Sequence, residues 1–220
     1  MNTFEKHELF QIEVLEKLKS QNFLQALVFG GGTMLRLCHD LDRYSVDLDF
    51  WFIKEIPLEN YFEKLKGFLQ IEYELTDAQI KFYSLLVEIR SAFYPRHLKI
   101  EIRKAVKNWD VQENIAFSPL SNIQVLVKTH TLQQTMRNKI DAFIERNEIR
   151  DAYDLEFLLR KGVHLPPMDK QQRDLLLERI DQFSATDIKV KLGSIINSEK
   201  RAYYIANGFG YLKGKLLENA

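Results

Sequence analysis

The chain changes its pattern near residue 119, and this change constrains its fold more than any other feature. Before that point, residues 71–75, 82–90 and 98–103 are rich in strand-forming side chains. From residue 132 to the end, apolar residues recur at helical spacing. The sequence therefore predicts an α/β domain at residues 1–125 and a helical domain at residues 126–220.

Local patterns predict the individual elements. The three strand-forming segments are expected to be neighbouring antiparallel strands. Further strands are expected at 25–29, 46–53 and 123–127. Helices are expected at 5–19, 33–39, 58–69, 130–146, 150–161, 168–182, 185–196 and 199–217.

Composition excludes several classes of protein. Basic and acidic residues balance at 31 each, so net charge does not direct the chain to nucleic acid. Residues 81–107 are nevertheless locally basic, which fits either a solvated sheet face or contacts with phosphates. A single cysteine, Cys38, cannot form an internal disulfide. We expect a cytoplasmic protein without a secretion signal, because the N-terminal segment is charged and no apolar run approaches the roughly 20 residues of a membrane span.

A glycine turn is the first candidate site. Gly31, Gly32 and Thr33 follow a short apolar run and open a predicted helix. Backbone N–H groups at a helix N-terminus bind anions, and glycines let a phosphate approach closely. The turn is a candidate phosphate site, although the same residues also suit an ordinary tight turn.

Two carboxylates follow on a predicted strand. Asp47 and Asp49 occupy alternate positions, so both side chains point to one face. Mg²⁺ takes hard oxygen ligands and shares them with substrate phosphates. The pair predicts a magnesium site, and the structural alternative is an ion pair with Arg36 or Arg43.

Glu101 is the third candidate acid. It lies between two apolar residues in a neighbouring predicted strand, which suits a third metal ligand or a base. The alternative is a cross-strand partner of Lys99 or Arg103.

Together these motifs resemble the AbiEii-type nucleotidyltransferase toxins, the group that includes MenT-like toxins. The first motif is Gly31-Gly32-Thr33 with Arg43-Tyr44-Ser45 and Asp47-Leu48-Asp49-Phe50. The second has Lys139 and Arg146 on one helical face, followed by Arg150-Asp151-Ala152-Tyr153-Asp154-Leu155. The resemblance covers roughly residues 25 to 160.

The resemblance implies an α+β, polymerase-β-like mixed sheet core with flanking helices and a C-terminal helical bundle. It implies an enzyme that moves a nucleoside monophosphate from a nucleoside triphosphate to an acceptor, RNA or tRNA, and that is silenced by a cognate antitoxin. The implied roles are metal binding by Asp47, Asp49 and Glu101, and catalysis by these three acids with Lys139 and Asp151. Nucleotide binding is assigned to Gly31, Gly32, Thr33, Arg43, Ser45, Lys139 and Arg146. Asp151 would hold Lys139 or complete the site. From its spacing on the helix, Asp154 is expected to cap the helix or to pair with Arg150 four residues earlier.

Three other functions remain open from the residues alone. The same turn and acids suit a module that binds nucleotides without transfer, or a transferase acting on a small molecule such as an aminoglycoside. A structural protein with fortuitous motifs is the third.

Overall fold

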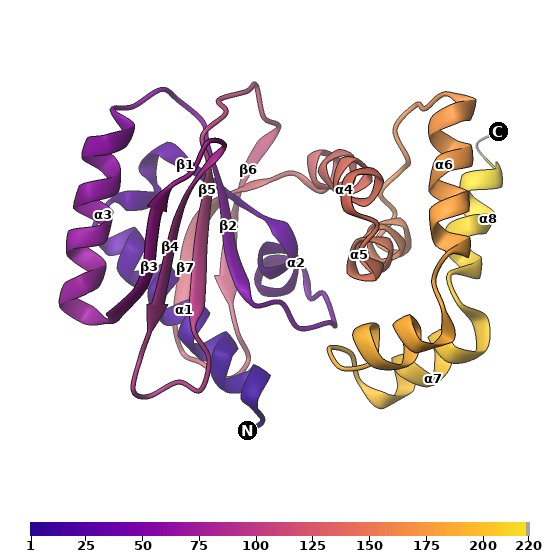
Figure 1. Cartoon of the computed structure of the whole chain (residues 1–220), viewed down its shortest axis with the longest axis horizontal. Coiled ribbons are helices and arrows are strands. Elements are labelled where there is room, and N and C mark those ends of the chain that lie inside the picture. The colour runs from indigo at the N-terminus through magenta and orange to yellow at the C-terminus, as the bar shows by residue number, and fades with distance from the viewer. Residues whose placement is uncertain (219–220) are drawn as a thin grey trace. The chain divides into compact units, whose positions relative to one another are not determined.

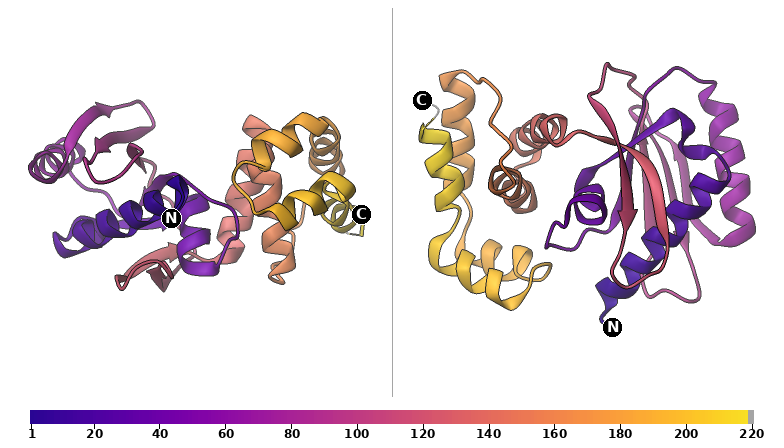
Figure 2. Two further views of the ribbon diagram at one scale, coloured as in Figure 1. Left: turned by 90° about the horizontal axis from the view of Figure 1, so that it is seen from below. Right: turned by 180° about the vertical axis from the view of Figure 1, so that it is seen from behind.

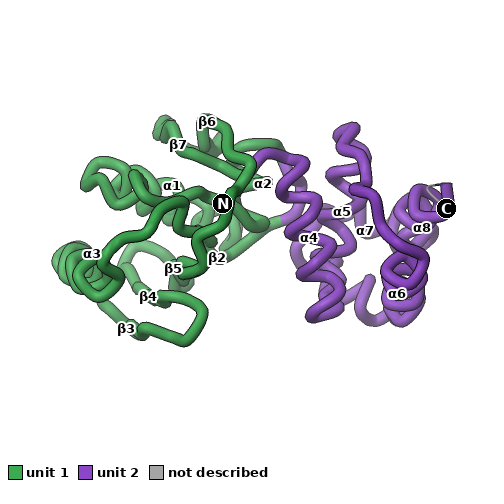
Figure 3. Tube along the Cα trace, turned by 90° about the horizontal axis from the view of Figure 1, so that it is seen from above, with its two compact units in different colours: residues 1–40, 44–130 green, residues 41–43, 131–220 purple. Residues whose placement is uncertain are grey.

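The computed structural model describes residues 1–218 and divides into two compact units (Figures 1 and 3). Unit 1 contains Met1–Asp40 and Tyr44–His130, and unit 2 contains Leu41–Arg43 together with the chain from Thr131 onward. The division falls between 130 and 131, whereas the sequence pattern placed it between 125 and 126. The last strand ends at His130 and completes the sheet, so it belongs to unit 1.

Unit 1 is built on one seven-stranded mixed sheet. Its strand order is β3-β4-β5-β2-β1-β7-β6. The strands are β1 (Leu27–Gly30), β2 (Asp47–Phe52), β3 (Glu74–Ile80), β4 (Ser84–Arg90), β5 (Leu98–Arg103), β6 (Val111–Phe117) and β7 (Gln124–His130). The antiparallel pairing of β4 with β5 confirms two of the predicted neighbours. Strand β3 also pairs antiparallel with β4, but the strand predicted at 71–75 overlaps it only at Glu74 and Leu75.

Helices of unit 1 pack against this sheet (Figures 1 and 2). They are α1 (Thr3–Ser20), α2 (Gly31–His39) and α3 (Leu58–Glu72). Helix α1 contacts β5 and β7, and α3 contacts β3 and β4. Asn2 and Glu5 form a capping box that begins α1, which satisfies two otherwise unpaired backbone donors.

The central strand β2 separates the core from an open face. Leu48, Phe50 and Phe52 are buried in the core. The alternate residues Asp47, Asp49 and Trp51 are only half-buried on the opposite face. Strand β2 runs antiparallel to β1 and parallel to β5, so the glycine turn and the β5 side chains flank its two acids.

Strand β6 was not predicted from the sequence. It lies at the edge of the sheet, where Ile115 and Phe117 on one face remain exposed to solvent. The sequence also predicted a strand at residues 71–75. In the structure, α3 continues to Glu72 and β3 begins at Glu74.

Unit 2 is helical. It contains α4 (Leu132–Arg146), α5 (Ile149–Arg160), α6 (Lys170–Asp181), a π-helical segment (Asp187–Leu192), α7 (Ser198–Asn207) and α8 (Gly210–Glu218). The single helix predicted at 199–217 is wrong, because Gly208 adopts a positive φ of 54° and divides it into α7 and α8. Within residues 1–218, no helix combines the length and the apolar character needed to cross a bilayer.

Candidate active site

The glycine turn is shaped by close contacts that exclude side chains. Gly31 has a φ of +72°, and a Cβ added there would lie 2.3 Å from Oδ2 of Asp49. A Cβ on Gly30 would lie 2.6 Å from the Trp51 ring. Both positions therefore require glycine, and the Asp49 carboxylate packs directly against the backbone that opens α2.

Thr33 connects the first turn of α2 to the beginning of β2. Its buried Oγ1 donates to the carbonyl oxygen of Asp47 at 2.5 Å and accepts from Nε2 of Gln11 at 3.3 Å. Gln11 also donates to the Ser45 carbonyl at 3.0 Å. This network fixes the position of Asp47 relative to the N-terminus of α2.

The three acids lie on adjacent parallel strands in matching register. Asp49 on β2 pairs with Glu101 on β5, and Asp47 pairs with Lys99. Side chains at paired positions point to the same face of a sheet. The structure therefore brings Asp47, Asp49 and Glu101 onto the open face beside the glycine turn.

Basic side chains neutralise part of this acidic face. Nζ of Lys99 lies 3.1 Å from Oδ2 of Asp47 and 3.9 Å from Oε2 of Glu101. Nη1 of Arg103 lies 3.3 Å from Oε1 of Glu101, which also accepts from Ser84 Oγ at 2.9 Å. Glu101 thus contacts both basic residues that its sequence alternative named, but they lie on its own strand β5 and not across the sheet. Ser84 was missed, since only the β4–β5 register places it opposite Arg103.

The donor chemistry of this face fits a divalent cation. Asp47 and Asp49 supply hard carboxylate oxygens next to a helix N-terminus, which is the ligand type that such cations share with phosphates. In the part of the chain that the structure describes, no three His, Cys, Asp or Glu side chains converge in a metal-binding group. Glu101 is instead held by its basic and hydroxyl partners. Asp47 and Asp49 are therefore the residues that fit a cation directly.

A second charged cluster lies inside unit 2. Nζ of Lys139 on α4 lies 3.0 Å from Asp151 and 2.6 Å from Asp154, both on α5 and both fully buried. Arg146 contacts Asp151 at 2.7 Å, and Arg43 contacts Asp154 at 2.6 Å. The expected contact between Lys139 and Asp151 is therefore present.

Asp154 and Arg43 contact each other inside unit 2. The predicted pairing of Asp154 with Arg150 is wrong, because the Asp154 carboxylate is buried between Arg43 and Lys139. Arg43 is 3% exposed and donates two hydrogen bonds to Asp154, so the structure shows it as an anchor of the segment Leu41–Arg43 within unit 2.

The Asp151 carboxylate stays charged inside the unit 2 cluster. Burial by itself would raise the pKa of Asp151, but Lys139 and Arg146 outweigh it and lower that pKa to about 2. The side chains of Arg43, Lys139 and Arg146 contact the carboxylates of Asp151 and Asp154. Arg146 is the most accessible cation of the three, with a side chain that is 42% exposed.

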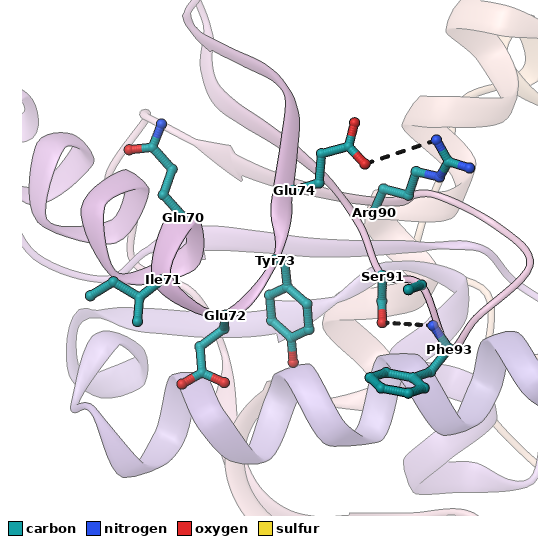
Figure 4. A pocket seen from close by; sticks show the side chains of 9 residues that line it. Gln70, Ile71, Glu72, Tyr73, Glu74, Arg90, Ser91 and Phe93 are labelled. Atoms are coloured by element: carbon teal, nitrogen blue, oxygen red, sulfur yellow. Dashed lines mark hydrogen bonds and ion pairs between the residues drawn. The ribbon is translucent and has the colours of Figure 1, made fainter.

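A surface pocket in unit 1 is lined by none of the predicted site residues. It lies among the end of α3, the start of β3 and the end of β4 (Figure 4). Glu74 and Arg90 approach to 3.9 Å there, and the Phe93 backbone donates to Ser91 Oγ at 3.2 Å. We assign no function to it.

Comparisons with known proteins agree with this arrangement. The family model described as "Nucleotidyl transferase AbiEii toxin, Type IV TA system" matches residues 13–204. A search of curated protein sequences found no match.

Solved structures share the fold. JHP933 from Helicobacter pylori aligns at a TM-score of 0.52 and 21% identity, over 95% of this chain and 93% of that protein. Another H. pylori protein, described as a nucleotidyltransferase, aligns at 0.55 and 22%, over 96% and 97%. An antigenic nucleotidyltransferase-like protein from Paracoccidioides brasiliensis aligns at 0.52 and 16%, over 90% and 97%. At these identities the structures establish the mixed-sheet nucleotidyltransferase fold.

The family assignment excludes a structural protein with fortuitous motifs, since the match extends over most of both units. The glycine turn, the acids of β2 and the Lys139 cluster all lie within it. The chain therefore belongs to the AbiEii family of nucleotidyl transferase toxins of type IV toxin–antitoxin systems.

Proposed function

We propose that this protein transfers a nucleoside monophosphate from a nucleoside triphosphate to RNA, with tRNA as the first candidate, and that Mg²⁺ supports the reaction. One observation carries the proposal: the Asp49 carboxylate packs directly against Gly31 at the N-terminus of α2. A triphosphate bound by that turn would lie beside the acids, where its charge requires a cation.

Each residue of unit 1 has a distinct part in this proposal. Backbone amides at Gly31, Gly32 and Thr33 bind phosphate oxygens, and Asp47 and Asp49 hold the cation. When bound, Mg²⁺ neutralises charge on the phosphates and aligns them for attack. Glu101, paired in register with Asp49, accepts the proton of the attacking hydroxyl or serves as a third ligand.

Unit 2 carries candidate phosphate-binding residues of its own. Arg146 has a side chain that is 42% exposed, so it is the strongest phosphate candidate there. Lys139 is buried by two carboxylates, and Asp151 holds its ammonium group in place. Arg43 supports the same cluster through Asp154.

An RNA acceptor is supported by the basic side chains of the 81–107 segment. Arg103 is 44% exposed on the open face beside Glu101. Lys107 is exposed and lies over the Trp109 ring. Contacts of this kind with phosphates make RNA binding weaker as salt rises. As a toxin, the enzyme would be paired with an antitoxin that restores growth when both are expressed.

Acceptor profiling tests the proposal. The full-length protein is incubated with Mg²⁺, each α-labelled nucleoside triphosphate and one of three acceptors: tRNA, ribosomal RNA or an aminoglycoside. We expect labelled RNA with the wild type and none with Asp49→Asn. Asp77→Asn, an aspartate of the edge strand β3, is the matched control and should retain transfer.

Other outcomes would identify a different function. Label on the aminoglycoside alone would indicate a small-molecule transferase. Nucleotide binding without label on any acceptor would indicate a binding module and would contradict the proposed reaction.

A further inference from the structure

Lys99 lies between two of the three acids of the open face. Its ammonium group approaches Asp47 at 3.1 Å and Glu101 at 3.9 Å, while its side chain stays 33% exposed. Strand β5 places Lys99 in register with Asp47 and two residues before Glu101. The lysine therefore reaches one carboxylate on the neighbouring strand β2 and one on its own strand β5.

This position overlaps with the one that a divalent cation would need. A cation such as Mg²⁺ lies about 2.1 Å from each carboxylate oxygen that binds it. An ammonium group 3.1 Å from Asp47 already neutralises that carboxylate and would repel a second cation beside it. A cation that binds this Asp47 oxygen would therefore compete with the Lys99 ammonium group.

The local charge supports the same conclusion. Asp47, Asp49 and Glu101 contribute three negative charges, and Lys99 and Arg103 contribute two positive ones. The two cations contact Asp47 and Glu101, which reduces the negative charge that these carboxylates offer to a doubly charged ion. A triphosphate would add negative charge.

We propose that Lys99 is a built-in counter-ion of the Asp47 and Glu101 carboxylates, which weakens cation binding until a nucleotide arrives. This inference rests on the proposed function, because it assumes that Asp47 and Asp49 are the cation ligands. It adds a residue that couples metal binding to nucleotide binding. Lys99 has a long flexible stem and partial exposure, so it is free to turn toward the phosphates once displaced.

Direct metal binding tests this role. Free Mn²⁺ is measured by electron paramagnetic resonance in solutions of the full-length protein without nucleotide. Lys99→Met, which keeps most of the side-chain length but no charge, should bind Mn²⁺ about tenfold more tightly than the wild type, or about 1.4 kcal/mol. Lys99→Arg keeps the charge and should resemble the wild type.

Three further variants make the result specific. Lys128→Met removes the same charge from β7, where the ammonium group lies 3.5 Å from the Gln25 carbonyl oxygen, and should leave Mn²⁺ affinity unchanged. The double variant Asp49→Asn with Lys99→Met should lose the gain in Mn²⁺ affinity that Lys99→Met shows alone. Lys99→Gln repeats the test if the methionine variant does not fold, as judged by circular dichroism.

Equal or weaker Mn²⁺ binding by the neutral Lys99 variants would overturn the inference. The transfer assay on the same preparations separates the two hypotheses. Transfer by the wild type without this gain in affinity would refute only the role of Lys99. No Mn²⁺ binding and no transfer in any variant would refute the proposed function as well.

Discussion

Replacing Asp154 by asparagine tests whether the buried cluster holds unit 2 together. The carboxylate is fully buried and accepts from Arg43 at 2.6 and 2.7 Å and from Lys139 at 2.6 Å. Arg43 and Lys139 are themselves 3% and 7% exposed, so neither can recover its hydration when the charge is lost. Breaking a buried ion pair by removing one partner costs about 3–5 kcal/mol.

Urea unfolding separates the effect on unit 2 from effects elsewhere. Both tryptophans, Trp51 and Trp109, lie in unit 1, so their fluorescence reports on that unit, whereas far-UV circular dichroism includes the helices of unit 2. We expect Asp154→Asn to lower the unfolding free energy by about 3–5 kcal/mol, with helix signal lost before the tryptophan signal changes.

Asp141→Asn is the matched control, because Asp141 is exposed on α4 and its loss should change stability by less than about 0.5 kcal/mol. A loss below about 1 kcal/mol for Asp154→Asn would refute the reasoning, since it would mean that the charges are hydrated or readily rearranged.

Two further predictions concern the turn and the pH dependence. Gly31→Ala places a Cβ 2.3 Å from Asp49 Oδ2 at a positive φ, so nucleotide binding measured by calorimetry should be lost, whereas Gly67→Ala on α3, with open space around it, should bind normally. The pKa of Asp151 is lowered to about 2 in the folded protein, so its stabilising contribution, about 2 kcal/mol, is present above about pH 4 and is lost as the pH falls toward 2. Acid titration followed by circular dichroism should show this loss in the wild type, and an equally steep loss in Asp151→Asn would contradict it.

Sequence patterns predicted the parts of the fold that local periodicity determines. The alternation in β2 identified which side chains face the core, and Asp47 and Asp49 lie on the opposite face as expected. Helical spacing identified α4 and α5 and placed Lys139 and Arg146 on one face, whereas the family resemblance implied the contact between Asp151 and Lys139. Strand β6 was missed because an edge strand with exposed Ile115 and Phe117 lacks a clear buried face.

Features that depend on long-range pairing were not predictable. Arg43 and Asp154 are separated by 111 positions, and only the tertiary fold brings them into contact. Ser84 reaches Glu101 through the register of β4 with β5, which no local pattern encodes. The sequence named Lys99 and Arg103 as partners of Glu101, whereas Ser84 emerged only from the sheet.

The position of the label in the product is the most direct test of nucleotide transfer at Asp47 and Asp49. The full-length enzyme is given Mg²⁺, tRNA and the same nucleoside triphosphate labelled at either the α- or the γ-phosphate. Transfer of a nucleoside monophosphate predicts RNA labelled from the α-phosphate only, pyrophosphate release in equal amount, and neither product with Asp49→Asn. RNA labelled from the γ-phosphate, or undiminished labelling by Asp49→Asn, would contradict the proposed reaction and its site.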